Sequence, residues 1–348
     1  IYNVSLSSEQ GYFNFVVGIA AATIIFLFKS RKPVLGWIAL AGSSISVLFL
    51  LLGILKLGPL SEYIFKSSLF ARWFYWQAAG KMMIDHPFFG VGMDGYGDAY
   101  MRSRPASFYS SGFFQLTDTA HSIPLDIGSN GGFPLFIAYV AIIFFALLSI
   151  VRIMKRKTEF DVVFATIVAA WVAYQAQSLI SINQLGLGVW GWSLSGLIIG
   201  YELNTRPDVI EGNPKATPRG KASMQKISAL AVITTFIATG AGIAAALPPY
   251  LAANKFYAAL GSGDAEVIQP VAYLKPYDRA RFAYVAQLLQ ENKLESRAIA
   301  VLRDATEIYP DSMELWRRWS TIPSASPADV ARALAEMKRI DPNNPDLK

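Results

Sequence analysis

The sequence predicts an all-α protein: a polytopic bundle of membrane helices followed by a small soluble α-helical repeat domain. Hydrophobic residues make up 53% of the 348 residues and charged residues only 16%, whereas a soluble domain carries about 25% charged residues. Apolar runs long enough to cross a bilayer recur along the chain. The region 248–348 differs, because it is rich in charge and carries prolines at a regular spacing.

Six apolar segments are predicted to span the membrane, because each approaches the ~20 residues that a spanning helix needs. They are Tyr12–Phe28, Val34–Leu55, Phe133–Val151, Phe160–Ile182, Leu187–Leu203 and Ile227–Leu247. The fifth has the weakest signal, since four glycines interrupt it, although packed membrane helices tolerate glycine. The chain opens without Met on the polar stretch IYNVSLSSEQGYFN, which is no signal peptide. We therefore expect further spans ahead of Tyr12 in a longer protein.

The distribution of Lys and Arg predicts the orientation of these segments. Basic residues follow the first, third and fifth segments, in KSRK (29–32), RIMKRK (152–157) and the linker 204–226. The regions predicted on the opposite side of the membrane have no net charge: 56–132 has six basic and six acidic residues, and 248–348 has thirteen of each. We predict four regions: N-terminal spans (1–55), an extracytoplasmic loop (56–132), C-terminal spans (133–247) and an extracytoplasmic helical region (248–348). The net charge of +6 thus reflects topology, and no nucleic-acid partner is expected.

The C-terminal region is predicted to contain two or three divergent tetratricopeptide-like repeats. Pro276, Pro310 and Pro342 lie 34 and 32 residues apart, each within a turn signal. A period near 34 with helix–turn–helix content is typical of that repeat. Stacked repeats present a concave surface, so we expect this region to bind a protein partner or a glycan.

The loop 56–132 contains the candidate functional residues. Its stretch 69–105 is predicted to be helical up to Pro87 and then to turn through GVGMDGYG. No strand precedes these glycines, which excludes a dinucleotide site; we expect them to let the backbone fold against membrane helices. Arg72 is either an interfacial arginine that reaches the lipid headgroups or a residue whose guanidinium binds two oxygens of a diphosphate. Arg102 and Arg104 either add charge to that site or are solvated.

The chain has two histidines, and they receive different interpretations. His86 precedes the helix-ending Pro87, which favours a structural role. His121 lies just before a predicted span, beside Asp118 and with Asp126 further on. It is either a helix cap or a general base whose pKa is tuned by a carboxylate. With two histidines and no cysteine, neither a metal site nor any other cofactor is expected.

Two motifs resemble the O-antigen ligase/polymerase-type domain. The first half of that domain is resembled by a spaced pattern of this chain: Arg72, Trp76, Ala79, Met83, Pro87, Gly90 and Gly92, followed by Tyr96 and Tyr100. Its second half is resembled by AHSIPLDIGSNGGFPLF (120–136). Two positions depart from the family pattern: Ser122 stands where Asn is usual, and Asn130 stands near where Glu is common. Some members of this family also carry tetratricopeptide tails.

The resemblance implies a membrane glycosyltransferase of the C-type architecture in the bacterial cytoplasmic (inner) membrane. The donor would be a glycan on a polyprenyl diphosphate such as undecaprenyl diphosphate. The acceptor would be a hydroxyl of a glycan, lipid or protein outside the cytoplasm. In this scheme His121 is the base and Arg72 neutralises the leaving diphosphate, without a metal and with inversion. Asp118 orients His121, and Arg102, Arg104, Asp118 and Asp126 contact the substrates.

Two other functions fit parts of the sequence. The chain would be a non-enzymatic scaffold that displays the helical repeats if Arg72 and His121 lay too far apart for one substrate to bridge. A transporter would carry charged or polar residues inside its spans. These spans are nearly free of them, with Gln175, Gln177 and Ser178 of the fourth as the main exceptions. The transporter therefore ranks last.

Overall fold

The computed structural model describes residues 9–30, 32–59, 61–64, 67–112, 116–206 and 229–347. Across these ranges the regular structure is helical and contains no strand, which confirms the predicted all-α class. The chain divides into two compact units, Ile1–Ala216 and Thr217–Lys348. The opening stretch 1–8, Arg31 of KSRK and most of the linker 204–226, including its four lysine and arginine residues beyond Arg206, lie outside the described residues.

Helices occupy all six predicted spans. Four candidate spans are long and apolar enough to cross a membrane: Gln10–Lys29, Pro33–Ile54, Ile123–Arg156 and Val232–Leu260. They correspond to the first, second, third and sixth predicted segments. The fourth segment contains a shorter apolar helix of 17 residues, α9 (Val162–Ser178). The glycine-rich fifth forms α10 (Leu185–Asn204), which is not among the four candidates.

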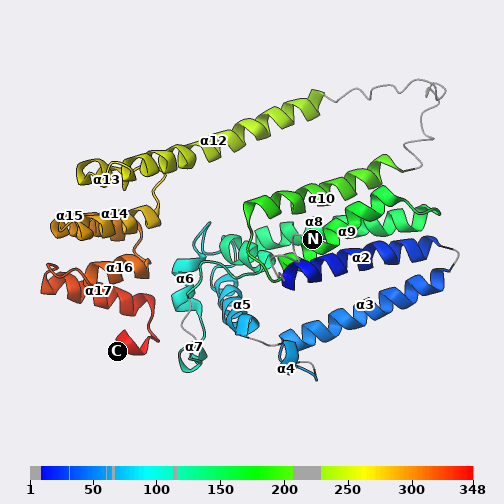
Figure 1. Ribbon diagram of the computed structural model, residues 1–348, viewed down its shortest axis with the longest axis horizontal. Coiled ribbons are helices and arrows are strands. Elements are labelled where there is room, and N and C mark those ends of the chain that lie inside the picture. The colour runs from blue at the N-terminus through cyan, green and yellow to red at the C-terminus, as the bar shows by residue number, and fades with distance from the viewer. Residues whose placement is uncertain are drawn as a thin grey trace. The chain divides into compact units, whose positions relative to one another are not determined.

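The spans of the first unit pack through small residues and aromatic rings. Helix α2 (Glu9–Lys29) lies against α3 (Pro33–Ile54) and α9, and α10 lies against α9 and the long helix α8 (Ile123–Arg156) (Figure 1). The buried core of this bundle includes Phe164, Trp171 and Ile198. The indole of Trp171 donates a hydrogen bond to Ser195 Oγ at 2.8 Å. This satisfies a polar group that hydrocarbon surroundings would leave without a partner.

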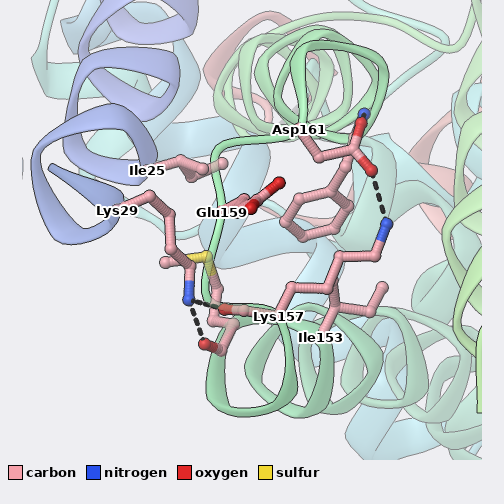
Figure 2. Close-up of a pocket in the computed structure, with 8 residues that line it drawn as sticks. Ile25, Lys29, Ile153, Lys157, Glu159 and Asp161 are labelled. Carbon is pink, nitrogen blue, oxygen red and sulfur yellow. Dashed lines mark hydrogen bonds and ion pairs between the residues drawn. The ribbon is translucent and has the colours of Figure 1, made fainter. Parts of the chain in front are cut away.

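Basic residues from the predicted cytoplasmic flanks meet at one end of this bundle. Figure 2 shows Lys29 of α2 reaching the carbonyl groups at the C-terminal end of α8, where it donates to Met154 O and Lys157 O. Lys157 in turn pairs with Asp161 at 2.5 Å. Cations are favourable at a helix C-terminus because of the helix dipole. The first and third basic flanks therefore lie on the same side, as alternating spans require.

The fifth basic flank joins the same end of the first unit. Arg156, at the end of α8, pairs with the buried Glu202 of α10 at 3.2 Å. Arg206 pairs with the other oxygen of Glu202 at 2.8 Å. Two arginines around one buried carboxylate satisfy a charge that would be costly alone.

The second unit begins with the long helix α12 (Ala229–Leu260), whose apolar N-terminal half is the sixth predicted span. It continues through α13 (Ala265–Val271), α14 (Arg279–Glu291), α15 (Glu295–Ile308), α16 (Met313–Ser320), α17 (Pro327–Ile340) and the 3-10 turn η1 (Pro345–Leu347). Helices α14 and α15 pack as one pair and α16 and α17 as another (Figure 1). The two pairs begin 34 residues apart, at Arg279 and Met313. The tetratricopeptide assignment itself stays a prediction.

Candidate functional site

The candidate site is built on helix α5 (Ser67–Asp85), whose buried face holds the loop 56–132 together. Phe74, Tyr75, Ala78 and Met82 of α5 form one core with residues of α6 (Tyr96–Ser103) and α7 (Ser107–Ser110). The hydroxyl group of Tyr96 donates to the backbone oxygen of Tyr75 at 2.7 Å. The motif tyrosine Tyr96 therefore fixes α6 onto the helix that carries Arg72.

The glycine turn after α5 is hydrogen-bonded to a break in helix α8. Gly132 has φ 71°, which divides α8 into two segments. The turn supplies partners at this break: Val91 N donates to Ser129 O at 2.8 Å, and Phe133 N donates to Pro87 O at 2.8 Å. A side chain on Gly90 would meet Ser129 O at 2.4 Å. The motif glycines thus let the turn pack against a membrane helix, as predicted.

His121 lies at the entrance to α8, in a left-handed backbone conformation with φ 51°. Its ring packs on Tyr75 of α5, with the two ring centroids 5.3 Å apart. Its Nδ1 atom lies 3.0 Å from Thr119 Oγ1 and 3.4 Å from Thr117 Oγ1. The ring is half-buried, and contacts at Nδ1 leave Nε2 as the nitrogen that can take up a proton.

Arg72 and His121 act on each other electrostatically. The pKa of His121 is lowered, chiefly because the ring is partly buried. The Arg72 charge lowers this pKa further, whereas the backbone oxygen of Thr119 and the charge of Asp118 raise it. Burial also lowers the pKa of Arg72, which interacts with Tyr75 as well. Tyr75 therefore links the two: its ring packs on His121, and it interacts with the Arg72 charge three residues earlier on α5, although 49 residues separate Arg72 from His121 in sequence.

Asp126 lies in the first turn of α8 and holds the backbone next to His121. Its carboxylate is buried, and Oδ1 accepts the N–H of Ala120 at 2.6 Å. Its own N–H donates to the backbone oxygen of Ser122, the N-cap residue of α8, at 2.8 Å. Among the described residues, no hydrogen-bond partner reaches its other oxygen, Oδ2. Asp126 therefore shapes the segment 120–126.

The other three predicted site residues differ in surroundings. Arg104 is buried: it donates to the Tyr109 hydroxyl and stacks on the rings of Phe108 at 4.3 Å and Tyr109 at 4.6 Å. Such cation–π contacts stabilise a desolvated guanidinium. Arg102 on α6 and Asp118 are exposed. Asp118 acts on His121 through its charge, while the atoms within hydrogen-bonding distance of Nδ1 belong to threonines.

Two residues of this site had no role in the sequence interpretation: Tyr75 and Thr119. Tyr75 lies three residues after Arg72, so the spacing i, i+3 on a helix places it beside Arg72. Thr119 lies two residues before His121, where a hydroxyl can reach the ring.

His86 is exposed at the end of α5. Within the described ranges, no three His, Cys, Asp or Glu side chains are grouped to hold a metal ion.

Residues 3–140 match the family model of the O-antigen ligases. The matched region includes Arg72, the glycine turn, His121 and the break in α8. No curated protein and no solved structure matches the chain significantly. The match covers 138 of the 348 residues and shows that this region is similar to the O-antigen ligases. The apolar helices indicate a membrane protein.

Proposed function

We propose that the protein is a glycosyltransferase of the O-antigen ligase or polysaccharide polymerase type. It moves a glycan from a polyprenyl-diphosphate carrier to an acceptor hydroxyl outside the cytoplasm. The observation that carries the proposal is that Tyr75 packs on the His121 ring while Arg72, three residues earlier on the same helix, acts electrostatically on both side chains, within the region that matches the ligase family. A scaffold without enzymatic activity has no need for this arrangement.

His121 is the general base in this proposal. The acceptor oxygen attacks the anomeric carbon of the donor glycan while Nε2 of His121 takes the hydroxyl proton. The bond between the anomeric carbon and the diphosphate oxygen breaks, and the diphosphate leaves with the electron pair. A single displacement of this kind inverts the anomeric configuration. The lowered pKa of His121 favours the neutral ring that this role requires.

Arg72 stabilises the leaving group in this proposal. The diphosphate gains negative charge as the glycosidic bond breaks, and a guanidinium can bind two of its oxygens at once. Partial burial strengthens that attraction relative to water. A positioned cation of this kind performs the charge stabilisation that such a transfer needs, and the carrier already activates the sugar.

The decisive experiment is glycan transfer by His121→Ala, with His86→Ala as the matched control. Loss of a general base lowers the rate by about 10²–10⁴-fold, whereas His86 is exposed at the end of α5 and its removal should leave transfer unchanged. Arg72→Lys keeps the charge but loses the fork, so we expect reduced transfer. Unchanged transfer by His121→Ala, at equal protein level in the membrane, would overturn the catalytic role and favour the scaffold.

The proposal includes a topology and a C-terminal docking module. Six spans would place loop 56–132 and the region 248–348 outside the cytoplasm, as the collected basic residues at the opposite end of α8 support. The helix pairs α14–α15 and α16–α17 would act as tetratricopeptide-like repeats that bind a protein partner.

A further inference from the structure

Four large apolar side chains are exposed where α5 passes into the glycine turn. Ile84, Phe88, Phe89 and Met93 have exposed fractions of 72%, 71%, 85% and 86%; we call them the apolar tip. Isolated exposed apolar residues are common. Here four lie within the ten residues 84–93, and exposed apolar residues that cluster mark membrane or protein contacts.

The apolar tip is attached to the start of the lipid-facing surface of α8. The backbone of Phe88 lies so close to Gly132 that a side chain there would meet Phe88 C at 2.6 Å. The next residue of α8, Phe133, donates its N–H to Pro87 O at 2.8 Å. From this point α8 exposes Leu135 and Ile137, with exposed fractions of 46% and 62%, inside a candidate membrane span.

We propose that the apolar tip inserts into the bilayer leaflet at the N-terminal end of α8, where it contacts the acyl chains beneath the lipid headgroups. The tip is continuous with the lipid-facing side of α8, and this continuity favours lipid over a protein partner. The exposed ion pair between Lys81 and Asp85, at 2.8 Å, suits the headgroup layer next to the tip.

Insertion of the tip would hold the candidate site at the membrane surface. Tip and site are both connected to α5 and α8: the tip follows α5 and is hydrogen-bonded to α8, while Arg72 lies on α5 and His121 lies two residues before α8. The hydrogen bonds at the break in α8 restrain the tip relative to His121. A substrate whose diphosphate lies at the headgroup level would then meet the site without leaving the bilayer. The insertion itself does not depend on the proposed enzymatic activity.

Spin labelling in lipid vesicles tests this insertion directly. The chain contains no cysteine, so single variants Phe89→Cys and Met93→Cys each carry one nitroxide at an exposed position. Ile137→Cys on α8 is the lipid-facing reference. Leu334→Cys on α17, with an exposed fraction of 45%, is the reference for an exposed apolar residue outside the spans. Accessibility to oxygen and to a water-soluble nickel complex is measured for each label.

We expect the oxygen-to-nickel accessibility ratio at 89 and 93 to be several-fold above that at 334 and close to that at 137. Ratios at both tip positions nearer to the value at 334 would overturn the proposal. Protection from both reagents would also overturn it, because it would show that protein covers the tip. The label at 137 gives the ratio of a lipid-facing position, and co-flotation of each labelled variant with the vesicles shows that the preparation is inserted.

Discussion

The buried carboxylate of Asp126 holds the backbone that presents His121: its Oδ1 atom accepts the N–H of Ala120 at 2.6 Å. His121 follows with φ 51°, a conformation that costs a residue other than glycine about 1–3 kcal/mol. The hydrogen bond to the carboxylate offsets part of this cost. Asp126 is therefore a positioning residue for His121.

Asp126→Ala should lower both the melting temperature and the rate of glycan transfer. A hydrogen bond to a charged group contributes about 1.5–3 kcal/mol, and its loss would let the segment 120–126 relax. Asp126→Asn keeps an acceptor oxygen and should retain more activity than the alanine variant. Asn130→Ala is the control, since it removes only the bond from Nδ2 to Asp126 O. Equal rates for all three variants would contradict the positioning role.

Thr119→Val should reduce kcat more than Asp118→Asn. Thr119 Oγ1 lies 3.0 Å from Nδ1 of His121, whereas Asp118 is exposed, so solvent screens its charge. A net hydrogen bond of about 1.4 kcal/mol corresponds to a tenfold change in rate. Steady-state kinetics of the two variants decides between them. A larger loss in Asp118→Asn would instead support the carboxylate as the group that orients the ring.

His121 should titrate below the usual histidine pKa of about 6.5, because burial lowers its pKa and Arg72 lowers it further. As a base it would stay neutral and active in mildly acidic solution. The same shift reduces stability as the pH falls through about 6.5, since the unfolded chain then binds a proton that the folded chain does not.

Nuclear magnetic resonance of ¹³C-labelled histidine can follow this titration without an activity assay. The chain has only two histidines, and His86→Gln removes one signal and so assigns the other. Arg72→Gln should raise the pKa of His121, because it removes the repulsion between the guanidinium and the imidazolium. An unchanged titration in Arg72→Gln would show that the two side chains do not share a site.

Gly90→Ala should destabilise the loop, whereas Gly80→Ala should not. Gly90 has φ 62°, and a Cβ atom would meet the backbone of Ser129 at 2.4 Å. Gly80 lies inside α5, where a Cβ atom would meet nothing within 4 Å, so alanine should stabilise the helix by up to about 1 kcal/mol. Thermal unfolding in detergent compares the pair. Equal midpoints would contradict the close packing of the turn on α8.

Ser107→Cys and Ser324→Cys should react with a membrane-impermeant maleimide in intact spheroplasts, and Thr158→Cys should not. The three positions are exposed, and the predicted topology places only Thr158 on the cytoplasmic side. Permeabilisation should then allow labelling of Thr158→Cys. Labelling of that variant in intact spheroplasts would reverse the assignment of the two sides.

Local patterns in the sequence were sufficient to predict where the helices lie. They were not sufficient where a feature depends on long-range packing. Apolar length predicted helices at all six positions, although two of them fall short of the candidate spans in length or hydropathy. The end of α5 near Pro87 was predictable because proline and glycine act on the backbone at their own positions. The break of α8 at Gly132 was not, because the turn after α5 must supply its hydrogen-bond partners.

The sequence by itself determined which residue types this protein offers for chemistry: a single histidine beside a predicted span, an arginine on a preceding helix, and glycines between them. Only the tertiary structure decided how they meet. It placed Tyr75 against the His121 ring, Thr119 at Nδ1, and Arg104 among aromatic rings. Sequence patterns describe periodicity along one element, whereas these contacts join α5, α6 and the entrance to α8 through packing.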